Sequence, residues 1–127
     1  MSKNKPVFHE LKIQLYHSYI YVFFEKNGWN YENFNNWYSK TFRQNITPED
    51  LTNCEGVTFE ARHNETVIFM AKTAKKSHFL HELLHVTLII LTSIGLKGLT
   101  EQEPICYLFD EIVEKLLPVF EKEHPTS

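Results

Sequence analysis

The segment from Ser77 to Leu96, SHFLHELLHVTLIILTSIGL, decides how the rest of the chain can be arranged. It carries His81, Glu82 and His85 as an H-E-x-x-H motif inside a strongly apolar run. Four residues make about one turn of an α-helix, so both imidazoles leave the helix on one face and can share one tetrahedral metal ion. Glu82 lies beside them, where its carboxylate can accept a proton from water instead of ligating the metal.

This segment predicts a helix that is buried in the centre of the fold. Ser77 is a candidate N-cap, and Gly95 is a candidate stop. Burying the three polar side chains of the motif without a common purpose costs roughly 1 to 3 kcal/mol each, which favours a metal site over core histidines. His78 is interpreted as a solvated residue near the helix start, with a supporting or ligating role as the alternative. Apolar residues recur nearly all round the helix: Phe79, Leu80, Leu83, Leu84, Val86, Leu88, Ile89, Ile90, Leu91 and Ile94.

The composition describes one domain and excludes some partners. With 127 residues, of which 43% are hydrophobic and 14% aromatic, the chain can form one compact core, and we expect flexible ends at residues 1–10 and 119–127. The net charge of −3 argues against nucleic acid and against anionic membranes, because those surfaces require clustered Lys and Arg. We expect a monomer.

Residues 1–10 are polar and lack the apolar stretch of a signal peptide, and the longest apolar runs are too short to span a membrane. Cys54 and Cys106 are about fifty residues apart and form no C-x-x-C pair, which is typical of reduced thiols. These features predict a cytoplasmic protein.

The segments before the motif predict an α+β fold. Residues 11–24, LKIQLYHSYIYVFF, indicate one long strand, with a helix as the alternative for their first half. Asn30 can cap a helix over residues 31–42, whose aromatic stripe is typical of packing against a sheet. Residues 57–62 and 66–72 predict a β-hairpin. We therefore expect a small, mostly antiparallel sheet packed on the central H-E-x-x-H helix.

A second helix is predicted from Thr100 to Leu117, ending at Pro118. Its connection to the motif helix is short, so the two helices are expected to pack antiparallel. Their spacing places four polar side chains on one face of the second helix: Glu103, Tyr107, Asp110 and Glu114.

Glu103 is the expected third metal ligand. A catalytic zinc ion typically has three protein ligands and one open position, which His81, His85 and Glu103 would provide. The alternative is that Glu103 caps its own helix, because T-E-Q-E at residues 100–103 matches a capping box. In that case Glu101 or Asp110 becomes the third ligand.

The HELLH pentad, the I-G stop at residues 94–95 and the stretch EPICYLFDEIV resemble the small metallopeptidase-like proteins of tailed bacteriophages, which have a gluzincin-like pattern. The resemblance covers roughly residues 57–113. It implies a minimal zincin-like domain in which His81 and His85 bind zinc and Glu82 is the general base. It also implies Glu103 as third ligand, Tyr107 one turn beyond it, and the cytoplasm of a host cell as location.

The motif and the resemblance together predict a zinc-dependent metallopeptidase or other amide hydrolase. Zinc lowers the pKa of water toward about 7, and Glu82 removes a proton as the water attacks a carbonyl. The expected oxyanion donor is Tyr107 or a backbone N–H of residues 66–72, with core packing the alternative for Tyr107. A peptide or protein substrate is expected to pair with strand 66–72.

A function from another class is the alternative. A chain of 127 residues lacks the second lobe with which larger gluzincins enclose their clefts. The same fold could therefore serve a catalytically weak or inactive binding protein that acts on a host or viral protein.

Overall fold

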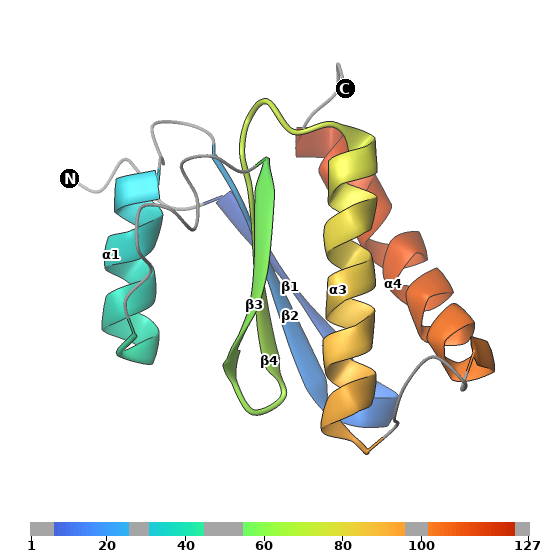
Figure 1. Ribbon diagram of the computed structural model, residues 1–127. Helices are drawn as coiled ribbons and strands as arrows, with labels where there is room; N and C mark the ends of the chain where they lie inside the picture. The colour runs from blue at the N-terminus through green and yellow to red at the C-terminus, as the bar shows by residue number, and fades with distance from the viewer. Residues whose placement is uncertain (1–6, 26–30, 45–54, 96–101, 124–127) are drawn as a thin grey trace.

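The computed structural model describes residues 7–25, 31–44, 55–95 and 102–123. These residues form an α+β fold in which one four-stranded mixed sheet lies between helices (Figure 1). Helix α1 covers one face of the sheet, and helices α3 and α4 cover the other. The elements in chain order are β1 (Val7–Ile13), the 3₁₀ turn η1 (Gln14–Tyr16), β2 (Ser18–Phe24), α1 (Tyr31–Phe42), β3 (Gly56–Arg62), β4 (Glu65–Met70), α3 (Lys76–Ser93) and α4 (Gln102–Glu123).

The strand order is β1-β2-β4-β3. The pairs β1–β2 and β3–β4 are antiparallel, whereas β2 and β4 run parallel. The α+β class, the aromatic helix over residues 31–42 and the β3–β4 hairpin are confirmed. This order makes β3 an edge strand of the described sheet and places β4 inside it.

The expected single strand over residues 11–24 is wrong, because the chain reverses within it. His17 adopts a left-handed conformation with φ 52°, and its N–H donates to the Gln14 carbonyl at 3.2 Å. Ile13 and Ile20, on either side of this turn, are both fully buried. The sequence still looks like one strand, because Leu11, Ile13 and Leu15 alternate and no Gly or Pro marks the turn. Strand β1 starts at Val7, so the flexible N-terminal end expected over residues 1–10 is also too long.

Two hydrophobic clusters hold the helices to the sheet. Alternate residues of a strand point to opposite faces. On the α1 face, Phe34 packs against Phe69 with ring centroids 4.7 Å apart. On the other face, Phe79 of α3 stacks on Phe120 of α4 at 4.7 Å, and both contact Phe24 of the sheet. Each fully buried Phe contributes roughly 1.5 to 3 kcal/mol relative to an exposed one.

Helix α3 (Lys76–Ser93) begins two residues earlier than expected. Its N-cap is Lys75, not Ser77, and the Lys75 N–H donates to Nδ1 of His78 at 2.9 Å. His78 thus satisfies one backbone donor at the helix start. At the other end Gly95, with φ 98°, donates its N–H to the Thr92 carbonyl at 3.0 Å, so the expected stop is confirmed.

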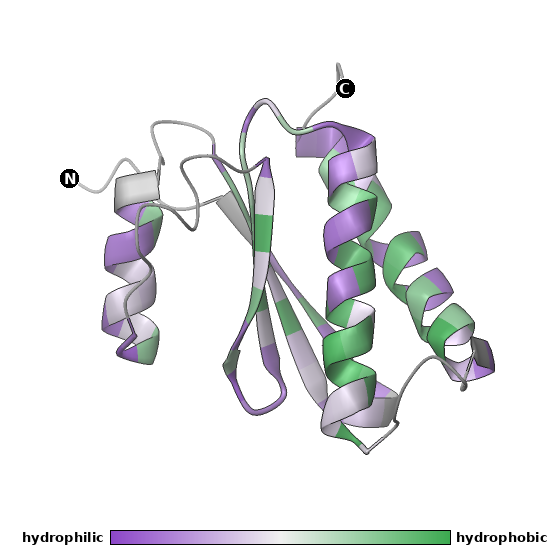
Figure 2. Ribbon diagram, in the orientation of Figure 1, coloured by the Kyte–Doolittle hydropathy of each residue, from purple (hydrophilic) through white to green (hydrophobic). Residues whose placement is uncertain are grey.

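The expectation that α3 is buried on all sides is wrong. The helix lies between β3 and α4, and its remaining side faces solvent (Figure 1). Figure 2 shows hydrophilic residues interleaved with hydrophobic ones along this helix. Its solvent side carries His81 and His85, together with Leu84, which is 42% exposed. Only part of the surface of α3 therefore packs into the core.

Helix α4 continues through Pro118 to Glu123, so its expected end at Leu117 and the expected flexible end from residue 119 are wrong. Proline removes one backbone donor from the helix. Phe120, two residues further, is fully buried, and this burial holds the last turn in place. None of the described helices is long and apolar enough to cross a membrane.

Some predictions fall on residues that the structure does not describe: the caps Asn30 and Thr100, the alternative ligand Glu101, and Cys54. Cys106 is a free, exposed thiol on α4.

Candidate metal centre

The two histidines of the motif converge on one point beside α3. Nε2 of His81 and Nε2 of His85 are 3.1 Å apart, and their rings lie nearly perpendicular at 83°. In a tetrahedral zinc site with Zn–N distances of about 2.0 to 2.1 Å, two nitrogen ligands are roughly 3.3 to 3.4 Å apart. The pair therefore has nearly the spacing that chelation of one metal ion requires.

Glu82 lies on the side of α3 that contacts β3, next to the side that carries the histidines. Its side chain is buried, with 7% of the residue exposed. Thr58 of β3 donates its Oγ1 hydrogen to Oε1 of Glu82 at 2.5 Å. A buried carboxylate needs such a partner, because an unsatisfied charge would be costly to desolvate. Thr58 thus fixes the position of the Glu82 carboxylate.

The backbone of β3 lies unusually close to Glu82 at Gly56. A Cβ atom added there would be 2.8 Å from Sδ of Met70 and 3.2 Å from Cγ of Glu82. Real Cβ contacts are rarely so short, so only glycine allows this approach without displacing a neighbour. The close approach in turn lets Thr58, two residues on and on the same face of the strand, reach the carboxylate.

Helix α4 does not bring its polar residues to the histidine pair. Glu103, Tyr107 and Asp110 are all exposed, and Tyr107 is 71% exposed. They lie on the side of α4 opposite the stripe that packs on α3 and the sheet, because the intervals between the two sets correspond to about half a helical turn. Core packing of Tyr107, the alternative for that residue, is wrong. The buried stripe consists of Leu108, Ile112, Leu116 and Phe120.

Within residues 7–25, 31–44, 55–95 and 102–123, no group of three or more His, Cys, Asp or Glu side chains converges on a common point. The structure therefore brings together His81 and His85, with Glu82 next to them, and does not add Glu103 or Asp110. It supplies two imidazole nitrogens, a ligand type that zinc accepts.

The strand that was expected to hold a peptide has no free edge. Strand β4 pairs with β2 on one side and with β3 on the other along its whole length, so its backbone groups are already engaged. The edge beside the motif helix belongs to β3, which contacts α3 directly. A peptide that adds to the sheet next to the histidine pair would pair with β3.

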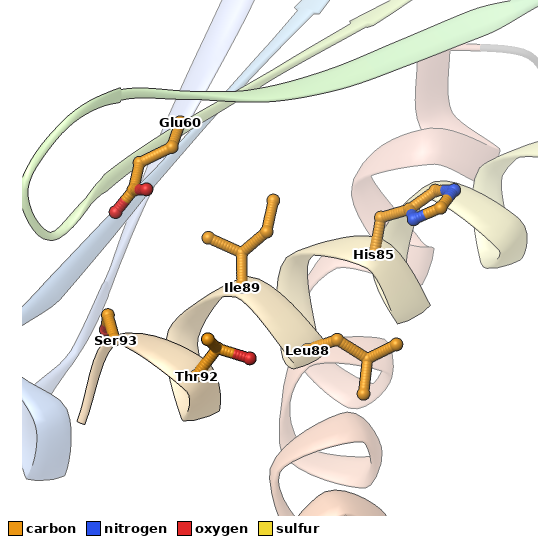
Figure 3. Close-up of a pocket in the computed structure, with 6 residues that line it drawn as sticks. All are labelled: Glu60, His85, Leu88, Ile89, Thr92 and Ser93. Atoms are coloured by element: carbon orange, nitrogen blue, oxygen red, sulfur yellow. The ribbon is translucent and has the colours of Figure 1, made fainter. Parts of the chain in front are cut away.

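A pocket of about 280 Å³ opens beside the histidine pair. Figure 3 shows the carboxylate of Glu60, from β3, at one end of it and the ring of His85 at the other, with Ile89 between them. The side chain of Glu60 is exposed. The lining residues are Glu60, His85, Leu88, Ile89, Thr92 and Ser93.

Gly56, Thr58 and Glu60 were missed as site residues by the sequence reasoning. They alternate with Val57, Phe59 and Ala61 in β3, so every second position is small or polar. This alternation was the signal that one face of the strand does not pack into a core.

Comparisons of the chain with protein-family models, with characterised proteins and with solved structures find no match. The chemistry of the site therefore follows from its own geometry: two imidazole nitrogens 3.1 Å apart and one buried carboxylate held by Thr58.

Proposed function

We propose that the protein is a small zinc-dependent hydrolase with a zincin-like fold, which cleaves a peptide bond or a related amide. The observation that carries this proposal is the convergence of His81 Nε2 and His85 Nε2 at 3.1 Å. It is supported by the buried Glu82 at the adjacent position of the same helix and by an edge strand, β3, packed along that helix.

The donor set suits zinc. Neutral imidazole nitrogens are common zinc ligands, and an i, i+4 pair on one helix fixes two of them at once. The described residues supply two of the three protein ligands that catalytic zinc sites typically use. The exposure of both histidines keeps the opposite side of the ion open to water and substrate.

Zinc, when bound, supplies a Lewis acid that acidifies water and polarises a carbonyl. The chain's own contribution is Glu82, whose Oε1 is held by the Thr58 hydroxyl. Oε2 is then the oxygen that accepts a proton from the attacking water and later passes it to the leaving amine. The buried position strengthens this role, since a fixed carboxylate in a partly dry site needs no reorganisation during the reaction.

Strand β3 orients the substrate in this proposal. Within the described sheet, β3 pairs with β4 on one side only. An extended peptide on its outer edge would run past Glu82 and the histidine pair, with main-chain hydrogen bonds supplying affinity.

A binding protein of the same fold is the second candidate. The solvent side of α3 carries Leu84, which is 42% exposed, beside both histidines. A partner protein would contact this side of the helix through Leu84 and the two imidazoles. In that case the partner would be a host or viral protein, and Glu82 would serve only to anchor Thr58.

The test is cleavage of an unfolded protein, such as reduced casein, with the products identified by mass spectrometry. The zinc-loaded protein should cleave it, a chelator should stop the reaction, and added zinc should restore it. Glu82→Gln should abolish cleavage while zinc content and folding persist.

The matched control is Glu111→Gln. Glu111 lies on α4, away from the histidine pair in sequence, and pairs with the exposed Lys115 at 3.2 Å, so this variant should cleave the substrate normally. If Glu82→Gln cleaves as fast as the parent, the hydrolase proposal fails and the binding protein takes its place.

A further inference from the structure

We propose that the pocket between β3 and α3 binds the side chain of a lysine or arginine in the substrate. The inference rests on the proposed function, because that function places the reacting bond beside the pocket. The binding of the cationic side chain depends only on the pocket itself. Its residues give the pocket one acidic end, an apolar wall and a size that suits a single side chain.

The acidic end is Glu60. Its side chain is exposed, and no ion pair or hydrogen bond engages its carboxylate in the part of the chain that the structure describes. The neighbouring cation on the strand, Arg62, is occupied elsewhere. Its guanidinium donates to the Thr41 carbonyl at 2.7 Å and lies over the ring of Phe42, on the α1 side of the sheet. A substrate cation at Glu60 therefore meets no competing charge from Arg62.

The apolar wall consists of Leu88 and Ile89, both partly exposed on α3. Lysine and arginine pack their methylene stems on apolar surface while the charged group remains in contact with water or a counterion. Ile89 lies between Glu60 and His85 in Figure 3, so a stem that crosses it would bring the cationic end to the carboxylate. An acidic side chain would be repelled, and a neutral one would leave Glu60 unpaired.

The size of the pocket also limits its occupant. Pockets for drug-sized ligands typically measure about 300 to 1,000 Å³. At about 280 Å³, this pocket lies near the lower end of that range, and its volume accommodates one long side chain. Because His85 forms its other end, the bound residue would lie next to the bond attacked at the histidine pair.

The experiment measures binding without cleavage, so that it stands apart from the test of hydrolysis. Three five-residue peptides that differ only at the central residue, with lysine, norleucine or glutamate there, are titrated into zinc-loaded Glu82→Gln protein. Binding is followed by the amide NMR shifts of Ile89 and Thr92. Norleucine has the stem of lysine without its charge, so it isolates the contribution of Glu60.

We expect the lysine peptide to bind about fivefold more tightly than the norleucine peptide, as for a partly solvated ion pair, and the glutamate peptide to bind most weakly. Adding Glu60→Gln should remove the difference between lysine and norleucine. The matched control is Glu10→Gln, an exposed glutamate on β1 at the other edge of the sheet, which should preserve that difference.

Equal affinity for lysine and norleucine in the parent background overturns the inference, as does a lysine preference that survives Glu60→Gln. If the preference is present and depends on Glu60 while the parent cleaves nothing, the pocket assignment stands and the hydrolase proposal falls.

Discussion

The two faces of strand β3 differ in chemistry although they belong to the same seven residues. Toward α1, Phe59 contacts the rings of Phe34 and Tyr38, at 6.3 and 4.9 Å, and Ala61 is only 4% exposed. Toward α3, the strand presents Gly56, Thr58 and Glu60. The apolar face holds the strand in place. The polar face is therefore free to contact Glu82 and to line the pocket.

The largest expected change in stability comes from Phe34→Ala, which removes an aromatic ring from the contact between α1 and the apolar face of β3. Phe34 is fully buried and contacts Phe23, Phe59 and Phe69. Removing a buried Phe typically costs about 3 to 5 kcal/mol, so urea unfolding should show a loss of that size. Zinc bound per folded molecule should not change, because the histidines lie across the sheet. A loss below about 1 kcal/mol would show that this face does not anchor the strand.

A smaller effect is expected on the polar face from Thr58→Val, which keeps the shape of the side chain but removes the hydroxyl. The buried Glu82 carboxylate then loses its partner at 2.5 Å, at a cost of about 1 to 3 kcal/mol. Cleavage should also slow, because the carboxylate is no longer held. The matched variant Thr58→Ser keeps the hydroxyl donor and should retain most of the stability and most of the cleavage rate. If Thr58→Ser and Thr58→Val lose the same stability and activity, the hydrogen bond to Glu82 is not the cause of the loss.

The smallest expected effect is on the pH dependence of stability, and it involves Tyr38, which packs on the apolar face of β3. Burial raises the pKa of the Tyr38 phenol above its ordinary value of 10.0, and its hydroxyl donates to Oε1 of Gln44 at 2.7 Å. The folded state then keeps this proton at a pH where the unfolded chain has lost it. The stabilisation is complete below pH 10 and declines as the pH rises through the folded-state pKa.

Tyr38→Phe should therefore flatten the fall of unfolding free energy above pH 10, measured by urea unfolding at several pH values. The decline should not vanish, because burial, followed by the nearby charge of Glu65, raises the pKa of Tyr21 as well. Identical pH profiles for the two proteins would contradict this assignment.

Local periodicity predicted most of the helices and strands, because the pattern of a helix or a hairpin depends on residues that are close in sequence. The i, i+1 and i+4 spacing likewise placed His81, Glu82 and His85 together. The chain reversal at residues 14–17 and the parallel pairing of β2 with β4 depend on contacts between distant segments, so no local pattern reveals them.

The third ligand shows the same limit. Spacing placed Glu103 correctly on a polar face of its helix, but the direction of that face is set by packing of the buried stripe around Leu108 and Ile112, which turns it to solvent. Thr58 and Glu60 could not be assigned to the site either. Their role depends on β3, and not β4, being the edge strand.

Zinc binding at the histidine pair is tested most directly by an equilibrium zinc titration of the parent protein, His85→Ala and Glu82→Gln. The expected result is one zinc ion per chain in the parent and in Glu82→Gln, and a loss of affinity of at least about tenfold in His85→Ala, since one of two converging imidazoles is gone. A folded parent that takes up no zinc, or a His85→Ala variant that binds as tightly as the parent, would contradict a metal centre at His81 and His85.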